Sequence, residues 1–102
     1  MRTIKSIMQK EKVCFLCGES IPFGYFNGLE EHHVFGGSNR KNSEKRGLKV
    51  WLCGESCHRT GSNSVHVNRV IDVCIKQKAQ SMYEERYGSR EDFIREFGKS
   101  WL

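Results

Sequence analysis

Four of the five cysteines in this chain form two close pairs. The pairs are Cys14-x2-Cys17 and Cys53-x3-Cys57. Four thiolates suit the tetrahedral coordination of Zn²⁺, and a site closed by four cysteines is structural rather than catalytic. Paired spacing of this kind is a fairly specific signal, although the three-residue gap of the second pair is slightly irregular. The sequence therefore predicts a structural Zn²⁺ bound by all four cysteines, with buried or redox-active thiols as the alternative.

All four histidines lie between the cysteine pairs or shortly after the second pair. His32 and His33 are adjacent, His58 directly follows Cys57, and His66 lies just before a predicted helix. Adjacent residues of a β-strand point to opposite faces, so we expect one histidine of the pair to bind a metal and the other to face a substrate. His58 and His66 could converge on the same cation. Imidazole suits zinc or another transition metal, and such a site keeps open positions for water and a phosphate oxygen. A single histidine is usually structural, but this grouping indicates a second metal site.

The chain is basic, and part of its positive charge lies between the histidines. Seventeen Lys and Arg residues against twelve Asp and Glu residues give a net charge of +5, which favours a polyanionic partner such as nucleic acid. The segment between the histidine groups also contains glycines and asparagines, which let backbone N–H groups approach phosphates. The predicted DNA contacts are Arg40, Lys41, Lys45 and Arg46. A solvated charged loop is the alternative for each of these side chains.

Short β-prone runs are expected to position the histidines. The runs 29–35 and 48–52 flank the segment 36–47, which is rich in turn formers, so together they predict a hairpin with a long loop. Residues 13–20 are typical of a zinc knuckle, in which Gly18 permits a tight turn. Residues 21–28, with a proline, two glycines and three aromatics, are expected to form a loop folded over the knuckle.

The second half of the chain changes to a helical period. Apolar residues recur at three- and four-residue steps; they are Val67, Val70, Ile71, Cys74, Ile75, Ala79 and Met82. The expected helix cap is Ser62, Asn63 or Ser64. Cys74 is expected to be a core residue rather than a ligand.

A final helix is predicted to open with a capping box from Ser89 to Asp92. Its apolar residues are Phe93, Ile94 and Phe97. These elements predict an α+β domain spanning residues 1–102, with the knuckle and hairpin–helix core over about 13–80 and C-terminal helices over about 65–97.

Composition limits the class of protein. Apolar residues make up 37% of the chain and charged residues 28%, so the core will be small and a structural metal would help to stabilise it. No apolar run approaches the roughly 20 residues of a membrane span. The segment "MRTIKSIMQKEK" lacks the apolar core of a secretory signal. We therefore expect a cytoplasmic protein without membrane association, in a compartment where disulfides rarely persist.

Three segments resemble the HNH endonucleases, whose core is the ββα-metal motif. They are the pair Cys14/Cys17, "EHHVFGG", and "LKVWLCGESCH". More narrowly, "HHVFGGSNRKNSEKRGLKVWLC" followed by "CHRTG…SVH" resembles small phage and prophage HNH-type proteins related to the recombination-enhancement, RecA-dependent nucleases of phages. The similar stretch runs roughly from Cys14 to Asn68, and the ending "FIREFGKSWL" is similar to the tail of those proteins.

The resemblance implies a role for each histidine. His33 corresponds to the general base, and His32, His58 and His66 correspond to ligands of a catalytic divalent cation, with Mg²⁺, Mn²⁺, Ni²⁺ and Zn²⁺ as candidates. The implied activity is hydrolysis of DNA phosphodiesters with low sequence specificity. The family's last ligand usually lies about one helical turn beyond the position of His58, whereas His66 lies further on, so the segment 59–65 must loop out.

A second departure concerns the middle Asn of the HNH motif. It normally lies just before the second cysteine pair, where this chain has Gly47 and Leu48; Asn39 and Asn42 lie further upstream and are weak substitutes. The role of this Asn in bracing the hairpin is therefore unassigned. A shifted register, with Glu31–His32 as ligand and base, stays open.

The sequence thus favours a metal-dependent endonuclease that nicks or cuts DNA with little specificity. A zinc-stabilised module that binds nucleic acid or protein without catalysis is the rival reading; it explains the cysteines and the charge but leaves the grouped histidines without a purpose. A third reading is a subunit of phage recombination or packaging machinery that acts with its partner. A second copy of the chain is a further candidate partner.

Overall fold

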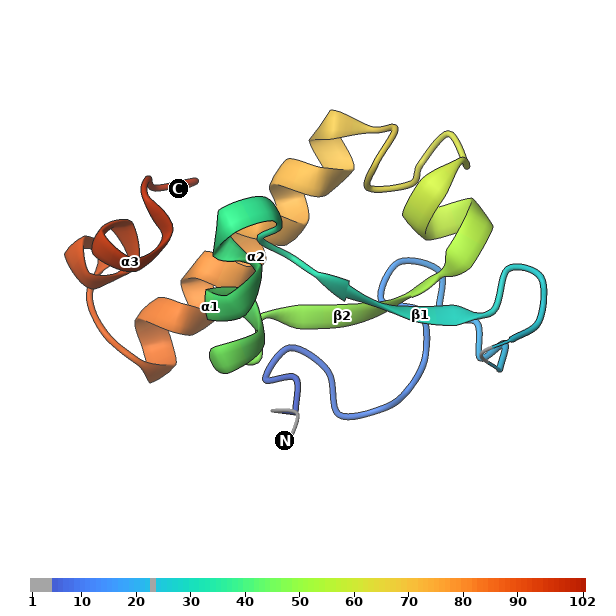
Figure 1. The fold of residues 1–102 in the computed structure, drawn as a ribbon, viewed down its shortest axis with the longest axis horizontal. Helices are drawn as coiled ribbons and strands as arrows, with labels where there is room; N and C mark the ends of the chain where they lie inside the picture. The colour runs from blue at the N-terminus through green and yellow to red at the C-terminus, as the bar shows by residue number, and fades with distance from the viewer. Residues whose placement is uncertain (1–4, 23) are drawn as a thin grey trace.

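The structure is a computed structural model that describes residues 5–22 and 24–102. Residues 1–4 of the predicted domain and residue 23 of the predicted loop lie outside this range. The elements are β1 (Leu29–His33), η1 (Gly37–Asn39), α1 (Arg40–Lys45), β2 (Lys49–Cys53), η2 (Gly54–Arg59), α2 (Arg69–Arg86) and α3 (Arg90–Phe97). Figure 1 shows β1 and β2 side by side across the middle of the molecule, with α3 at one end. The α+β class is confirmed. Within the described ranges, no helix is long and apolar enough to cross a membrane.

The predicted hairpin is present, and its register is fixed. β1 and β2 pair antiparallel, with Leu29 opposite Cys53 and His33 opposite Lys49. The prediction of a long loop over 36–47 was wrong, because this segment forms a 3-10 turn and the short helix α1. Arg, Lys and Glu in the sequence "RKNSEK" are good helix formers, which outweighs the turn-forming residues around them.

Hydrogen bonds to Ser43 close the end of the hairpin. Its buried hydroxyl accepts from the Phe35 N–H at 3.3 Å and donates to the Leu48 carbonyl at 2.5 Å. The Leu48 N–H in turn donates to the Ser43 carbonyl at 2.8 Å. Gly47 between them has φ +70°, and a Cβ there would lie 2.6 Å from the Lys5 carbonyl oxygen, so glycine is required. The end of α1 is thereby fixed to both strands.

The long helix starts later than the sequence suggested. Asn68 caps α2, because its side-chain oxygen accepts from the N–H groups of Val70 at 3.0 Å and Ile71 at 3.3 Å. The expected caps at residues 62–64 were wrong, since that segment forms the turns that precede the helix. The capping box of α3 is confirmed: Ser89 and Asp92 each bond the other's backbone N–H.

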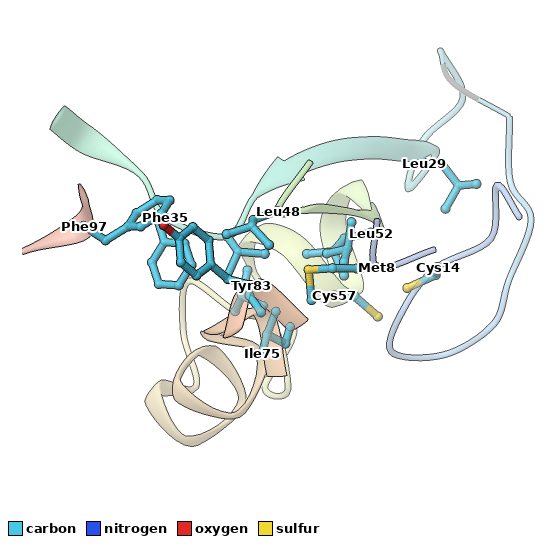
Figure 2. Close-up of a cluster of buried hydrophobic side chains, with 14 of the residues drawn as sticks. Met8, Cys14, Leu29, Phe35, Leu48, Leu52, Cys57, Ile75, Tyr83 and Phe97 are labelled. Carbon is cyan, nitrogen blue, oxygen red and sulfur yellow. The ribbon is translucent and has the colours of Figure 1, made fainter. Parts of the chain in front are cut away.

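The core has an aromatic end and a sulfur-rich end. Figure 2 shows the rings of Phe35, Tyr83 and Phe97 together at one end of the cluster. Cys14 lies toward the other end, and Met8 and Cys57 lie between. Phe35 and Phe97 have ring centroids 4.9 Å apart. These ring contacts join α2 and α3 to the segment after β1, so the aromatic end holds the helices on the hairpin.

The expected apolar face of α2 is only partly buried. Ile75 and Ala79 are in the core, whereas Val67 and Val70 are 59% and 69% exposed and Cys74 is exposed. The prediction that Cys74 is a core residue was therefore wrong. At about 100° per residue, Val70 and Cys74 lie roughly 100° to 180° around the helix from Ile75 and Ala79, and a sheet of two strands covers only one narrow stripe.

Side chains of the α1 region bind the end of α3. The amide groups of Asn39 and Asn42 donate to the carbonyls of Phe97 and Glu96, both at 3.0 Å. Arg46 forms two bonds with the Glu96 carboxylate, at 2.7 and 3.0 Å. The two asparagines thus brace α3 rather than the hairpin, and the Arg46 guanidinium, predicted to contact DNA, is held in an internal ion pair.

The packing of α3 generates a stability prediction. Phe93→Ala should lower the free energy of unfolding by about 3–5 kcal/mol, because Phe93 is fully buried among other rings. Ile94→Ala on the same helix should cost less than about 1 kcal/mol, since Ile94 is 38% exposed. Urea unfolding followed by circular dichroism measures both. Equal losses for the two variants would mean that α3 does not pack as described.

Candidate metal centres

The four paired cysteines meet in one group. Their sulfur atoms all lie within 4.8 Å of one another, and Cys17 Sγ and Cys53 Sγ are 3.4 Å apart. A tetrahedron of sulfurs around zinc, with Zn–S bonds of about 2.3 Å, has edges of about 3.8 Å. One observed separation is 3.4 Å and none exceeds 4.8 Å, which is close enough to this value for the donor set to fit a tetrahedral ion.

Two different turns bring the pairs together. In the knuckle, the Gly18 N–H donates to the Cys14 carbonyl at 2.9 Å, and the Phe15 N–H donates to the Trp51 carbonyl of β2 at 2.8 Å. The second pair spans the end of β2 and η2, which is a π-helical turn. Because a π turn is wider than an α turn, it accommodates the three-residue gap between Cys53 and Cys57. The irregular spacing thus has a structural cause.

The thiols oppose one another's ionisation. Burial raises the pKa of Cys57 to about 12 and also raises that of Cys53, and hydrogen bonds and charge from the neighbouring cysteines add to both shifts. Burial also acts to raise the pKa of Cys14, but backbone hydrogen bonds, from Cys17 first, lower it to about 7. Four thiolates cannot coexist here without a compensating cation. The group could therefore hold a structural metal ion such as zinc, as the sequence predicts.

Zinc content should distinguish Cys53 from Cys74. Cys53→Ala should release the metal and unfold or strongly destabilise the protein, because metal binding and folding are coupled in small domains. Cys74→Ala is the matched control, since Cys74 is exposed and lies outside the group. Elemental analysis and thermal unfolding measure both effects. A folded, metal-free parent protein would contradict the zinc assignment.

His32, His58 and His66 form a second group. One ring nitrogen of each lies within 4.8 Å of the others, and the ring centroids are 4.8 to 5.6 Å apart. His66 reaches the group because the chain loops back: the Val65 N–H donates to the Cys57 carbonyl at 3.0 Å, and the His66 N–H to the His58 carbonyl at 3.4 Å. The structure therefore brings together the three histidines that correspond, by the resemblance, to cation ligands.

A carboxylate orients one of these rings. Glu30 Oε1 lies 2.9 Å from His58 Nδ1, and Glu30 also pairs with Arg59. A carboxylate only accepts, so Nδ1 carries the hydrogen and the free lone pair of His58 is on Nε2. Metal-binding histidines commonly have such a carboxylate partner.

The innermost histidine is suited to a cation and poorly suited to a proton. Burial, followed by the charges of His58 and His66, lowers the pKa of His32 to about 3. Its Nε2 is buried and has no hydrogen-bond partner among the described residues. A buried polar atom without a partner is costly, and a metal ion bound by the three rings would satisfy it. The donor set thus fits a divalent cation that accepts nitrogen ligands.

Acid should destabilise the cation-free protein through His32. Its pKa is about 3 when folded and 6.5 when unfolded, so between these values the unfolded state binds more protons and stability falls as pH falls. The slope for one proton is up to about 1.4 kcal/mol per pH unit. Urea unfolding at pH 7, 6 and 5, with zinc content checked at each pH, should give a smaller slope for His32→Gln than for the parent. Identical slopes would show that His32 is not held neutral.

His33 lies in a different set of contacts. Its Nε2 is 2.8 Å from Glu44 Oε1, and Lys49 Nζ lies 2.8 Å from Glu44 Oε2 and 3.2 Å from Glu31 Oε2. Glu31, His33 and Glu44 have the composition of a metal site. However, Lys49 is buried between the two carboxylates and supplies the positive charge itself. We therefore interpret this set as an ion-pair network that holds His33.

Both histidine groups open onto one cavity. It has a volume of about 610 Å³, and its lining includes His32, His33, His58, His66, Glu31, Arg40, Arg69, Asp72 and Lys76. Of the four predicted DNA contacts only Arg40 lies here. Lys41 and Lys45 are exposed elsewhere on α1, and Arg46 lines a separate cavity with Glu96.

Sequence reasoning missed Glu30, Glu44, Lys49 and Arg69. The hairpin register alone could have placed Lys49 opposite His33. Glu44 and Arg69 follow from the position of α1 and the start of α2, which no local pattern gave. No family model, curated protein or solved structure matches the chain, so its function must be argued from the chemistry of this cavity.

Proposed function

We propose that this protein is a metal-dependent endonuclease that hydrolyses DNA phosphodiester bonds with low sequence specificity, built on an HNH-type ββα-metal core. One observation carries the proposal: a three-histidine group with an unsatisfied buried nitrogen shares a cavity with a separately held histidine. A ligand set beside an independent base is the arrangement that metal-assisted hydrolysis requires.

In this proposal His32, His58 and His66 hold the catalytic cation. Zn²⁺, Ni²⁺, Mn²⁺ and Mg²⁺ are the candidates, and nitrogen ligands favour the transition metals. When bound, the cation supplies electrostatic stabilisation to a non-bridging phosphate oxygen and to the leaving 3′ oxygen. Because Glu30 accepts from Nδ1 of His58, Nε2 is the nitrogen of this ring that is free to bind the cation.

His33 acts as the general base. Since Glu44 only accepts, His33 Nε2 carries a hydrogen and the neutral ring has its free lone pair on Nδ1. Nδ1 takes a proton from water while the water oxygen bonds to phosphorus and the P–O3′ bond breaks. The 3′ oxygen gains a proton from solvent, which leaves 5′-phosphate and 3′-hydroxyl ends.

Glu44 and Ser43 together fill the role left unassigned by the missing Asn. Ser43 braces the end of the hairpin and Glu44 orients the base, from adjacent positions in α1. The shifted register is less well supported, because His32 groups with His58 and His66 and Glu31 pairs with Lys49.

The rival is a zinc-stabilised binding module without catalysis. It accounts for the cysteines and for the net charge of +5. It gives no reason for three neighbouring imidazoles, one of them buried with an unpartnered nitrogen, on the wall of an open cavity. We therefore favour the enzyme, acting on DNA in a bacterial host cytoplasm, alone, as a homodimer or with a phage recombination or packaging protein.

Nicking of supercoiled plasmid across Mg²⁺, Mn²⁺, Ni²⁺ and Zn²⁺ tests the proposal. His33→Ala should keep the fold, the cysteine-bound zinc and DNA affinity but lose about 10²–10⁴ in rate, as expected for removal of a general base. His32→Ala should instead weaken cation binding, and added metal should partly restore its activity. Lys78→Ala, at an exposed position of α2, is the control.

Glu44 variants, measured in the same assay, test whether Glu44 orients His33. Glu44→Ala should lower kcat with little change in KM, and Glu44→Gln should recover part of the rate because its amide oxygen still accepts from His33. If the parent never cuts with any of the four cations or with any plausible partner, the binding-module hypothesis is correct. If His33→Ala cuts as fast as the parent while His32→Ala is inactive and not rescued by metal, His32 is the base.

A further inference from the structure

We propose that Arg40 and Arg69 form a phosphate clamp that holds the DNA backbone in the histidine cavity. This inference rests on the proposed function, because it takes nucleic acid as the ligand. It adds Arg69, from the second half of the chain. It leaves out the basic side chains of the α1 region that lie outside the cavity, which are Lys41, Lys45 and Arg46. Arg40 and Arg69 both line the cavity that contains the histidines.

Arg40 and Arg69 differ from the other described arginines in having no partner within the protein. Across residues 5–22 and 24–102, Arg46, Arg59, Arg90 and Arg95 each form an ion pair with a carboxylate, and Arg86 lies over the Tyr87 ring. Arg40 and Arg69 are the two described arginines whose side chains have no such partner. That both unpaired guanidinium groups line one cavity is the observation that carries the proposal.

The carboxylates of the cavity wall do not compensate these charges. Asp72 is paired with Lys76 at 2.8 Å, and Glu31 with Lys49 at 3.2 Å. Lys76 also lies over the Trp101 ring, 4.5 Å from its centroid. Lys76, the lysine of the cavity wall, is therefore engaged within the protein, whereas the two guanidinium groups are available to an anion.

The chemistry of guanidinium selects a phosphate ligand. Its planar N–H groups match two phosphate oxygens, and it stays charged at any working pH. Arg40 is the first residue of α1 and Arg69 the first residue of α2, so each is anchored to a helix rather than to a free loop. Contacts to the DNA backbone from two helices would fix the strand relative to His33 without reading base sequence. This agrees with low sequence specificity.

Binding without cleavage tests the clamp. A fluorescein-labelled 20-base-pair duplex is titrated by anisotropy, in the His33→Ala background and without added divalent cation, so that the probe stays intact. Arg40→Ala and Arg69→Ala should each lower affinity about tenfold. Each should also reduce the slope of log K against log[salt] by about one unit. The charge-matched control is Arg90→Ala with Arg95→Ala on α3, which should change affinity less than twofold; circular dichroism and zinc content confirm the fold of each variant.

The outcomes separate this inference from the nuclease proposal. If the control pair weakens binding as much as Arg40→Ala with Arg69→Ala, net charge alone explains affinity and the clamp is wrong. If Arg69→Ala binds as the parent does, the clamp is also wrong, whether or not the parent cuts DNA. If both arginine variants behave as expected and the parent never cuts with any cation or plausible partner, the clamp stands and the protein is a DNA-binding module.

Discussion

The register of the β1–β2 hairpin is the constraint on which both candidate metal centres and the cavity depend. It places His33 opposite Lys49 at one end and Leu29 opposite Cys53 at the other. A slip of one residue would move every side chain of a strand to the opposite face. His32 would then leave the histidine group, and His33 would leave Glu44. The register is held at one end by the hydroxyl of Ser43 and at the other by the Gly54 N–H, which donates to the Gly28 carbonyl at 2.9 Å.

The two ends of the hairpin have different kinds of core, which suits a chain with few apolar residues. The aromatic rings pack α2 and α3 against one end of the hairpin, and the cysteines gather at the other end (Figure 2). Neither cluster extends over the whole hairpin. A metal ion bound by four thiolates would stabilise the end that the rings do not reach, because it cross-links the knuckle to β2 and η2.

Chemically identical imidazoles receive different environments from their partners. His58 has Glu30 and His33 has Glu44. Among the described residues, His32 contacts the rings of His58 and His66 and has no carboxylate partner. A carboxylate partner fixes which nitrogen carries the hydrogen, whereas burial without a carboxylate disfavours protonation of His32. In the proposed enzyme, the separation of a ligand set from a base thus follows from which acidic residue each ring can reach. Glu30 lies on β1 beside these histidines, and Glu44 comes from α1 across the hairpin end.

The sequence by itself determined the features that depend on neighbouring residues or on fixed spacing. The cysteine pairs, the two strands, the opposite placement of His32 and His33, and the capping box at Ser89 follow from local geometry, and the structure contains each of them. The tertiary structure alone decided the features that depend on distant segments. It attached the end of α1 to both strands through Ser43. It also placed turns before Asn68, where the backbone of His66 returns to that of His58. It also exposed Cys74, because a narrow sheet covers one stripe of a helix. Glu44 and Arg69 gained their candidate roles only through packing, since nothing in the residues beside them indicates which cavity or ring they will face.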